Sequence, residues 1–151
     1  MAARVLPFLL SALLLAACTD NANIPGVTQD PEASAKAAYP DVPPAEEANE
    51  LIDRGQKLFK GLTCEQCHST GPDRSGLAGP PLGGYADRAL EHQDHDPLKA
   101  RRWTVKHIKD PRKYPGSFAG TDEYRGTFMT PFNRITDDDL RALVEYLFSL
   151  R

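Results

Sequence analysis

The sequence has few of the features that define several common classes of protein. It contains three cysteines, too few for a disulfide framework, and its longest apolar run covers 13 residues, too short to span a bilayer. The net charge is −3, and no basic stretch is interleaved with aromatic residues as in nucleic-acid-binding domains. With 151 residues, 40% of them hydrophobic, the chain has the length and composition of one globular domain with no role in nucleic-acid binding.

The most informative stretch is Cys64-Glu65-Gln66-Cys67-His68. A Cys-x-x-Cys-His sequence is typical of the covalent attachment of c-type haem. Two thiols three positions apart can form thioethers with the two vinyl groups of one haem, and the histidine that follows can direct a ring nitrogen at the iron. A redox-active cysteine pair would need a βαβ context and a zinc site would need a second pair of ligands, and neither is visible. The motif therefore predicts one haem c, bound through Cys64 and Cys67.

The start of the chain has the features of an export signal. Arg4 precedes the apolar run 5–17, which has the length of a signal peptide. The run ends in Leu-Ala-Ala-Cys, which resembles the lipobox of bacterial lipoproteins, where the cysteine becomes the first residue and is acylated. The alternative is an ordinary signal peptide cut before an incidental cysteine. We expect residues 1–17 to be a lipoprotein signal peptide. Lipid on Cys18 would hold the protein on the periplasmic side of a bacterial membrane, which is either the inner or the outer membrane.

Residues 18–44 show no apolar period. They are rich in small and acidic residues and contain five prolines. This composition predicts a disordered tether that follows the lipidated cysteine. In the polyproline conformation the 26 residues after Cys18 would reach at most ~80 Å, which would let a domain swing between neighbours on one membrane.

Residues 45–151 are expected to form an all-α domain. Apolar residues near the helical period predict a helix over 45–60, and its interior Gly55 suggests that another element packs closely there. A second helix is expected over 97–110, ended by the following proline. A third should begin after Thr136, which is a suitable N-cap in front of three aspartates.

Residues 54–68 resemble the amino-terminal part of a class I cytochrome c, the monohaem family with histidine and methionine ligands. The resemblance implies the cytochrome c fold, in which three to five helices wrap around one covalently attached haem. It also implies that Gly55 and Phe59 cross the carboxy-terminal helix near Leu143 and Tyr146.

Residues 79–88 are similar to the Gly-Pro-x-Leu segment of the same family. The resemblance implies that the Pro80 carbonyl accepts a hydrogen bond from Nδ1–H of His68, which leaves Nε2 for the iron. It also implies that Leu82 packs against the haem. Arg88 falls where the family often has an arginine beside a haem propionate, and the alternative is a solvated charge on a helix.

Met129 is the only methionine after the first residue, and it is followed by a Pro-Phe pair. This segment resembles the distal loop of the family, so the resemblance implies that Met129 is the second axial ligand beside His68. Iron with both axial positions filled can exchange an electron but has no site for a substrate. The alternative is a methionine that fills a gap in the core. Residues 118–128 lengthen the loop beyond the family pattern, which puts its conformation in doubt.

Three further features leave alternatives open. His107 falls at a position that faces the distal haem edge in some relatives, and it is either a pocket residue or a rival ligand. The stretch 91–96 contains two histidines and is better explained as a solvated acidic loop than as a metal site. Residues 99–113 carry seven bases against one acid, which form either a solvated face or a docking surface for an acidic redox partner.

The sequence thus predicts a membrane-tethered carrier of single electrons that is not itself an enzyme. Its donor would be a quinol-oxidising complex or a dehydrogenase, and its acceptor an oxidase, a reductase or a photosynthetic reaction centre. The first alternative is a fixed electron-transfer subunit of a larger membrane oxidoreductase complex. A less favoured one is a haem sensor or peroxidase in which Met129 is a labile ligand.

Overall fold

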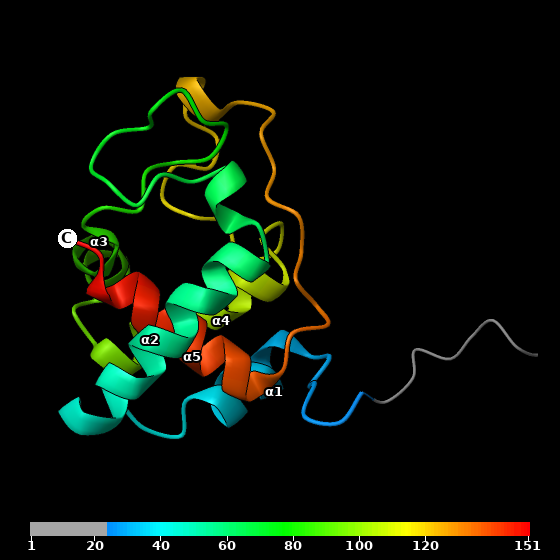
Figure 1. Cartoon of the computed structure of the whole chain (residues 1–151). Coiled ribbons are helices and arrows are strands. Elements are labelled where there is room, and N and C mark those ends of the chain that lie inside the picture. Colours follow the sequence, from blue (N-terminus) through cyan, green and yellow to red (C-terminus); the bar gives the residue numbers. More distant parts are fainter. Residues whose placement is uncertain (1–23) are drawn as a thin grey trace, which may run out of the picture.

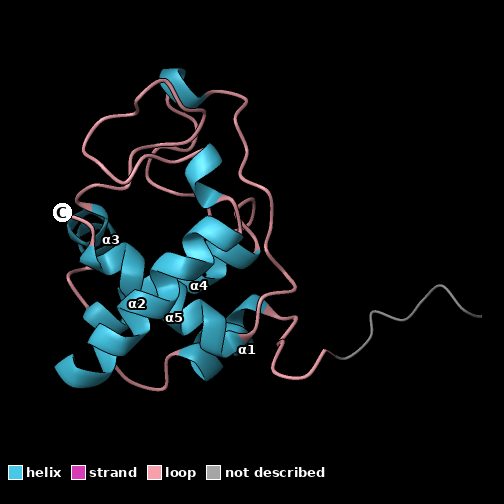
Figure 2. Cartoon of the chain, in the orientation of Figure 1, coloured by secondary structure: helices cyan, strands magenta, loops and turns pink. Residues whose placement is uncertain are grey.

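The computed structural model describes residues 24–151, and this part of the chain consists of helices and loops without a strand (Figures 1 and 2). Its α-helices are α1 (Pro31–Ala38), α2 (Ala45–Gly61), α3 (Tyr85–His92), α4 (Pro97–Lys109) and α5 (Asp137–Ser149). Two short 3-10 helices, η1 (Cys64–Gln66) and η2 (Asp122–Tyr124), interrupt the loops. The all-α fold class is confirmed. The predicted signal peptide and Cys18 lie outside the described residues.

The helices α2 and α5 cross with their backbones in close contact. A β-carbon on Gly55 would lie 2.1 Å from the backbone oxygen of Ala142, so the backbones of the two helices touch at this point. One turn further along α2, the rings of Phe59 and Tyr146 meet with their centroids 5.4 Å apart. The interior glycine is explained by this approach, because no other residue leaves the necessary space.

Two helices, α4 and α5, begin at side-chain N-caps. The Asp96 carboxylate accepts hydrogen bonds from the backbone N–H groups of Leu98 (2.9 Å) and Lys99 (3.0 Å) at the start of α4. The Thr136 hydroxyl accepts one from the N–H of Asp139 (3.1 Å) at the start of α5. These contacts satisfy donors that have no partner within the helix. The three predicted helices are present, and their boundaries lie within one residue of the predicted ones.

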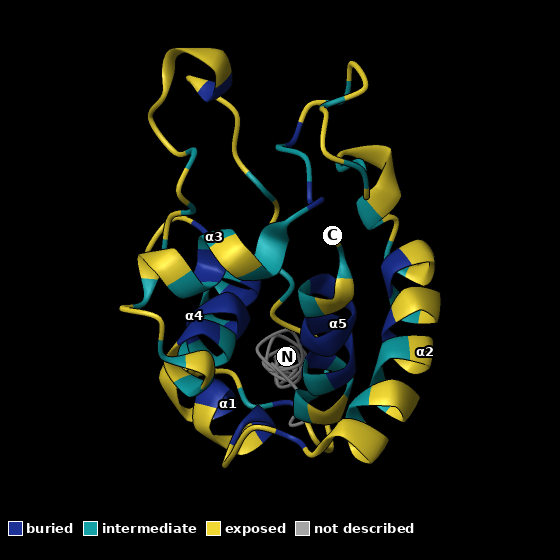
Figure 3. Cartoon of the chain, turned by 90° about the vertical axis from the view of Figure 1, so that its left-hand side faces the viewer, coloured by how far each residue is buried: buried dark blue, intermediate teal, exposed yellow. Residues whose placement is uncertain are grey.

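Buried residues gather on the facing sides of α1, α4 and α5, whereas α2 turns an exposed face outward (Figure 3). Val105, Leu140 and Val144 have no exposed surface. The packed helices occupy one end of the molecule, and the long loops that connect α2 to α3 and α4 to α5 occupy the other (Figure 1). No helix among the described residues is long and apolar enough to cross a membrane.

The segment before α2 departs from the prediction. The sequence predicts a disordered tether over residues 18–44, and this is wrong for residues 27–44. α1 packs against α4 and α5, and Ala35, Ala38 and Tyr39 are almost completely buried in the common core. The amino-terminal segment is therefore part of the folded domain.

The prediction failed because α1 buries small residues. Its start carries ordinary signals: the Asp30 carboxylate accepts a hydrogen bond from the N–H of Ala33 (2.8 Å), and Pro31 occupies the first turn, where proline is tolerated. Its buried face, however, is made of serine and alanine. Without large apolar residues at the helical period, the segment has the composition of a flexible chain.

Tyr39 joins this segment to both α4 and α5 through buried polar contacts. Its hydroxyl lies 2.9 Å from Glu145 Oε1 and 2.8 Å from the backbone oxygen of Arg141. Glu145 also accepts two hydrogen bonds from the Arg101 guanidinium, at 2.6 Å and 3.1 Å. The carboxylate of Glu145 is tolerated in the interior because it is paired with a cation and hydrogen-bonded.

Replacing Tyr39 with phenylalanine tests this docking. We expect the free energy of unfolding to fall by about 1–3 kcal/mol, because the buried Glu145 carboxylate loses a hydrogen-bond donor. Val42→Ala, at an exposed position of the same segment, serves as the control and should change stability by less than about 0.5 kcal/mol. Denaturant unfolding measures both variants. Equally small effects would mean that the segment is not docked in solution.

Candidate functional site

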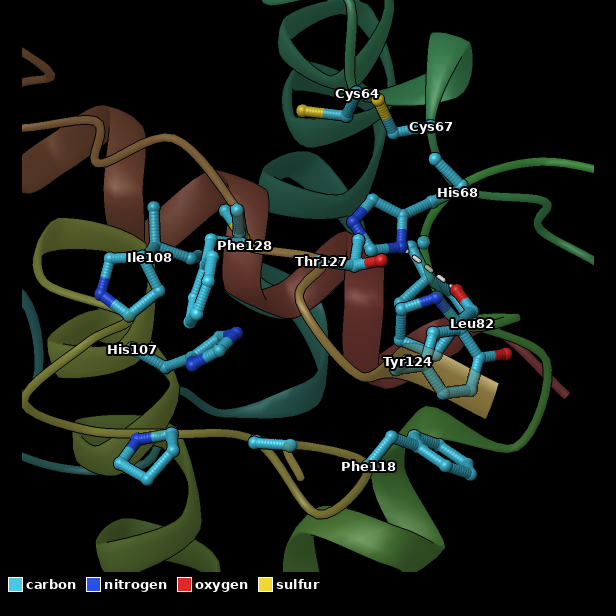
Figure 4. A pocket seen from close by; sticks show the side chains of 18 of the residues that line it. Cys64, Cys67, His68, Leu82, His107, Ile108, Phe118, Tyr124, Thr127 and Phe128 are labelled. Atoms are coloured by element: carbon cyan, nitrogen blue, oxygen red, sulfur yellow. Dashed lines mark hydrogen bonds between the residues drawn. The ribbon is translucent and has the colours of Figure 1, made fainter. Parts of the chain in front are cut away.

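A cavity of ≈ 750 Å³ lies where the two long loops meet α4 and α5, and its walls are mostly apolar (Figure 4). The turn that contains η1 forms one wall, and the loop around Pro80 continues it. The side of α4 that carries Ile108 forms another, and the loop 115–132 closes the cavity. A volume of this size is typical of sites that bind a cofactor.

Both cysteines of the Cys-x-x-Cys-His motif border this cavity (Figure 4). The turn begins at Thr63, which adopts the left-handed conformation (φ 60°), and the N–H groups of Cys67 and His68 both donate to the carbonyl of Cys64. This compact turn carries all three side chains of the motif. The two thiols are not joined in a disulfide, and burial raises the pKa of the Cys64 thiol. Both sulfur atoms are therefore available as thiols at the cavity wall.

The ring of His68 is oriented by a hydrogen bond to the loop that follows. Its Nδ1 lies 2.8 Å from the carbonyl oxygen of Pro80, the contact that the family resemblance implies (dashed in Figure 4). Because a carbonyl can only accept, the proton is on Nδ1 and Nε2 keeps a free lone pair. Burial lowers the pKa of His68, although the hydrogen bond to Pro80 opposes this effect. The ring thus has the tautomer in which Nε2 could bind a metal.

Gly79 gives this histidine its space. A β-carbon on Gly79 would lie 2.5 Å from Cε1 and 2.7 Å from Nδ1 of His68. The N–H of Gly79 also donates to the carbonyl of Cys67 (2.7 Å), which fastens the loop to the motif. The sequence signal for this contact is the glycine that precedes Pro80.

Leu82 and Arg88 both border the cavity but differ in their contacts. Leu82 is buried in the hydrophobic core. The Arg88 guanidinium donates to the carbonyls of Gly83 (2.6 Å) and Pro81 (2.7 Å), so it holds the loop that also carries Pro80. This structural role was not predicted, and it shows that Arg88 is not simply a solvated charge. The contact with a haem propionate stays a prediction.

Met129 borders the same cavity as His68, from a loop 61 positions further along the chain. Its side chain is half-buried and packs against the hydrophobic core. The structure thus brings together the two residues that the sequence nominates as axial ligands.

The lengthened loop before Met129 is folded against the loop that follows the cysteine motif. Arg74 forms an ion pair with Glu123 (3.3 Å), and its guanidinium lies 4.9 Å from the centroid of the Tyr124 ring. Phe118 and Tyr124 contact each other, and both border the cavity. These two aromatic residues were not predicted as part of the site, and their only sequence signal is their place in an insertion that is otherwise mostly polar.

His107 also borders the cavity, which agrees with the interpretation of this histidine as a pocket residue. Its Nδ1 lies 2.7 Å from the backbone oxygen of Tyr114, and its ring is stacked on Trp103 with an interplanar angle of 13°. Burial lowers the pKa of His107, and the hydrogen bond to Tyr114 opposes this effect. Trp103 is itself a cavity residue that the sequence did not indicate.

Most of the basic side chains in the stretch 99–113 are engaged in contacts within the protein. Four of its seven bases have partners on other elements: Arg101 with Glu145, Arg102 with the Tyr39 carbonyl, Lys106 with Glu32, and Lys109 with the Thr28 carbonyl. These contacts hold α1 and α5 against α4. The exposed bases are Lys99, Arg112 and Lys113. A docking surface on this stretch would therefore be smaller than the sequence suggests.

The stretch 91–96 forms the end of α3 and the turn into α4. His92 packs edge-on against Trp103 (4.8 Å between centroids), and Asp96 is occupied as the cap of α4. Among the described residues, no three His, Cys, Asp or Glu side chains are grouped so that they could hold a metal ion. The structure thus gives no support to a metal site in this stretch.

The residues at the cavity fit one haem c. The apolar walls suit its ring, two free thiols are available for the vinyl groups, and His68 offers a free Nε2. A family model described as Cytochrome c matches residues 52–151, the part of the chain that holds all these groups. No match was found among curated proteins or among solved structures.

Proposed function

Because this chain belongs to the cytochrome c family, whose members are haem-based electron carriers, we propose that it carries single electrons on one six-coordinate haem c. Cys64 and Cys67 hold the haem through thioether bonds. His68, through Nε2, and Met129, through its sulfur, are the axial ligands of the iron. When bound, the haem supplies one-electron transfer between ferric and ferrous iron.

The observation that carries this proposal is the orientation of His68. The hydrogen bond from Nδ1 to Pro80 (2.8 Å) fixes the tautomer, and Nε2 belongs to a ring that borders a cavity which Met129 also borders. The apolar walls exclude water from the iron, and a soft thioether ligand favours the ferrous state and raises the potential. With both axial positions filled by the chain itself, no position is left for a substrate.

We further propose that lipid on Cys18 anchors the protein on the periplasmic side of a bacterial membrane. Several acyl chains on one residue give stable anchoring, which a single chain does not. On that membrane the partners would be a quinol-oxidising complex or a dehydrogenase as donor, and an oxidase, a reductase or a photosynthetic reaction centre as acceptor. The anchor would raise the effective concentration of the carrier at such partners.

A second candidate function is that of a fixed electron-transfer subunit in a larger membrane oxidoreductase complex. The docked segment 27–44 favours it, because most of the chain that a mobile carrier would use as a tether is folded onto the domain. Extraction in mild detergent separates the two candidates. Co-purification with other subunits at one fixed stoichiometry supports the subunit, and recovery of the protein alone supports the mobile carrier.

Replacing Met129 with alanine tests the ligand assignment. In a redox titration with absorbance spectra, we expect the variant to lose the thioether signature and its potential to fall by on the order of 100 mV. Asn133→Ala, at an exposed position four residues further along that does not border the cavity, should leave both unchanged. An unchanged potential in Met129→Ala would show that another group is the ligand. Strong carbon monoxide binding by the reduced wild-type protein, without a thioether signature, would favour a sensor or peroxidase instead.

A further inference from the structure

Two histidines, His68 and His107, border the same cavity from different elements. His68 follows η1, and His107 lies in the last turns of α4 (Figure 4). Only the first belongs to the cysteine motif. The second has no role in the proposed function, which fills the axial positions with His68 and Met129.

The hydrogen bonds of the two histidines match. Nδ1 of His68 lies 2.8 Å from the carbonyl of Pro80, and Nδ1 of His107 lies 2.7 Å from the carbonyl of Tyr114. Both carbonyls can only accept, so in each ring the proton is on Nδ1 and the lone pair is on Nε2. A neutral imidazole whose other nitrogen donates to a backbone carbonyl is the usual form of a histidine that binds a metal.

The Nε2 atom of His107 is not completely buried. It has no hydrogen-bond partner among the described residues, where the ring bonds only through Nδ1. Within the same part of the chain, no completely buried side-chain nitrogen or oxygen lacks a partner. Nε2 is therefore not completely enclosed by protein atoms, and His107 is one of the residues that line the cavity.

The ring of His107 is held by contacts with its own helix and with the following loop. It stacks on Trp103, one turn earlier in the same helix (5.4 Å between centroids), and a β-carbon on Gly116 would lie only 3.4 Å from its Cε1. Met129 is half-buried on a loop without regular structure, three positions after Gly126, which adopts a positive φ of 80°. Met129, the nominated axial ligand, is thus on a loop, whereas His107, which has a lone pair that can bind a metal, is on a packed helix.

We propose that His107 is a reserve axial ligand, which binds the iron through Nε2 when the thioether of Met129 leaves it. The proposal rests on the proposed function, in which Met129 is the resident ligand. In the exchange one iron–sulfur bond breaks and one iron–nitrogen bond forms. His107 enters as a neutral ring, so neither a proton nor an electron is released. The exchange converts a site that favours ferrous iron into one with two nitrogen ligands, which favours ferric iron.

The test compares Met129→Ala with the double variant Met129→Ala/His107→Phe, as purified holoproteins. Electron paramagnetic resonance of the oxidised forms reports the ligands, and carbon monoxide binding to the reduced forms reports an open site. We expect Met129→Ala to show a low-spin signal with two nitrogen ligands. We expect the double variant to lose this signal, to become high-spin and to bind carbon monoxide faster.

Two further variants make the result specific. Met129→Ala/His92→Phe removes a histidine that also touches Trp103 but does not border the cavity, and it should keep the low-spin signal. If Met129→Ala/His107→Phe does not fold and accumulate, Met129→Ala/His107→Gln takes its place. This variant should also become high-spin.

The outcomes separate this proposal from the proposed function. A high-spin Met129→Ala protein whose carbon monoxide binding is unchanged by His107→Phe overturns the reserve ligand but leaves Met129 as the resident one. A low-spin signal that survives in Met129→Ala/His107→Phe also overturns it, because another group then fills the site. A thioether signature that persists in Met129→Ala overturns the Met129 assignment, and the exchange with it.

Discussion

Gly55→Ala is expected to lower the free energy of unfolding by at least about 3 kcal/mol. The added β-carbon would lie 2.1 Å from the backbone oxygen of Ala142 and 2.7 Å from Cβ of Tyr146. Neither atom is the flexible end of a side chain, so α5 has to move away from α2. The movement would also displace Phe59 and Leu143, which border the cavity.

Gly61→Ala is the matched control, because Gly61 belongs to the same helix and a β-carbon there would have no neighbour within 4 Å. Alanine is a better helix former than glycine, so this variant should be as stable as the wild type or more stable by up to about 1 kcal/mol. Denaturant unfolding followed by circular dichroism measures both. A Gly55→Ala protein as stable as Gly61→Ala would mean that the two helices do not touch there in solution.

The double variant Cys64→Ala/Cys67→Ala is expected to lose covalently bound haem completely. Both thiols border the cavity and neither is engaged in a disulfide, so they are the groups that can form thioethers with the vinyl carbons. Haem staining after denaturing electrophoresis measures the covalent bond directly. The wild-type band should stain, and the band of the double variant should not.

Cys18→Ser is the control for this experiment and tests the anchor at the same time. It removes the one cysteine that lies outside the haem-binding motif, so the protein should keep its haem stain in full. It should also move the protein from the membrane fraction to the periplasmic fraction, because the proposed lipid has no attachment site. A Cys18→Ser protein that stays with the membrane would contradict the lipid anchor, whereas loss of its haem stain would contradict the assignment of the two thioether cysteines.

The parts of the molecule that could be predicted are those whose signals are local. The cysteine motif specifies its own turn, and Thr136 with its three aspartates specifies the start of α5. The close approach at Gly55 follows from the cost of an interior glycine in a helix. In each case a few adjacent residues carry the physical constraint, so one sequence is enough to recognise it.

The parts that could not be predicted depend on partners that are distant in the chain. α1 is held by Tyr39, whose hydroxyl contacts are more than 100 positions away. Arg101 appears as one charge of a basic stretch, yet it pairs with Glu145 in the interior. Trp103 and His107 border the cavity because of the way in which α4 packs. A helical period in the sequence predicts a helix, but it does not show which loop a given face of that helix will meet.

The docking of α1 limits the length of the tether that would join the domain to its lipid anchor. The carbonyl of Gly26 accepts a hydrogen bond from the N–H of Asp137, so the folded body includes this residue. The position of Gly26 is 26 − 18 = 8 residues after Cys18, and a segment of this length can extend at most ~28 Å, against ~80 Å for a tether of 26 residues. That span is shorter than the diameter of the domain, which for a sphere with a radius of gyration of roughly 14 Å is about 36 Å. A domain on so short a tether could not rotate freely relative to the membrane. The end that carries α1 would therefore face the lipid, and the end that holds the cavity would face away from it. Redox partners would then have to present their own cofactors well above the bilayer surface.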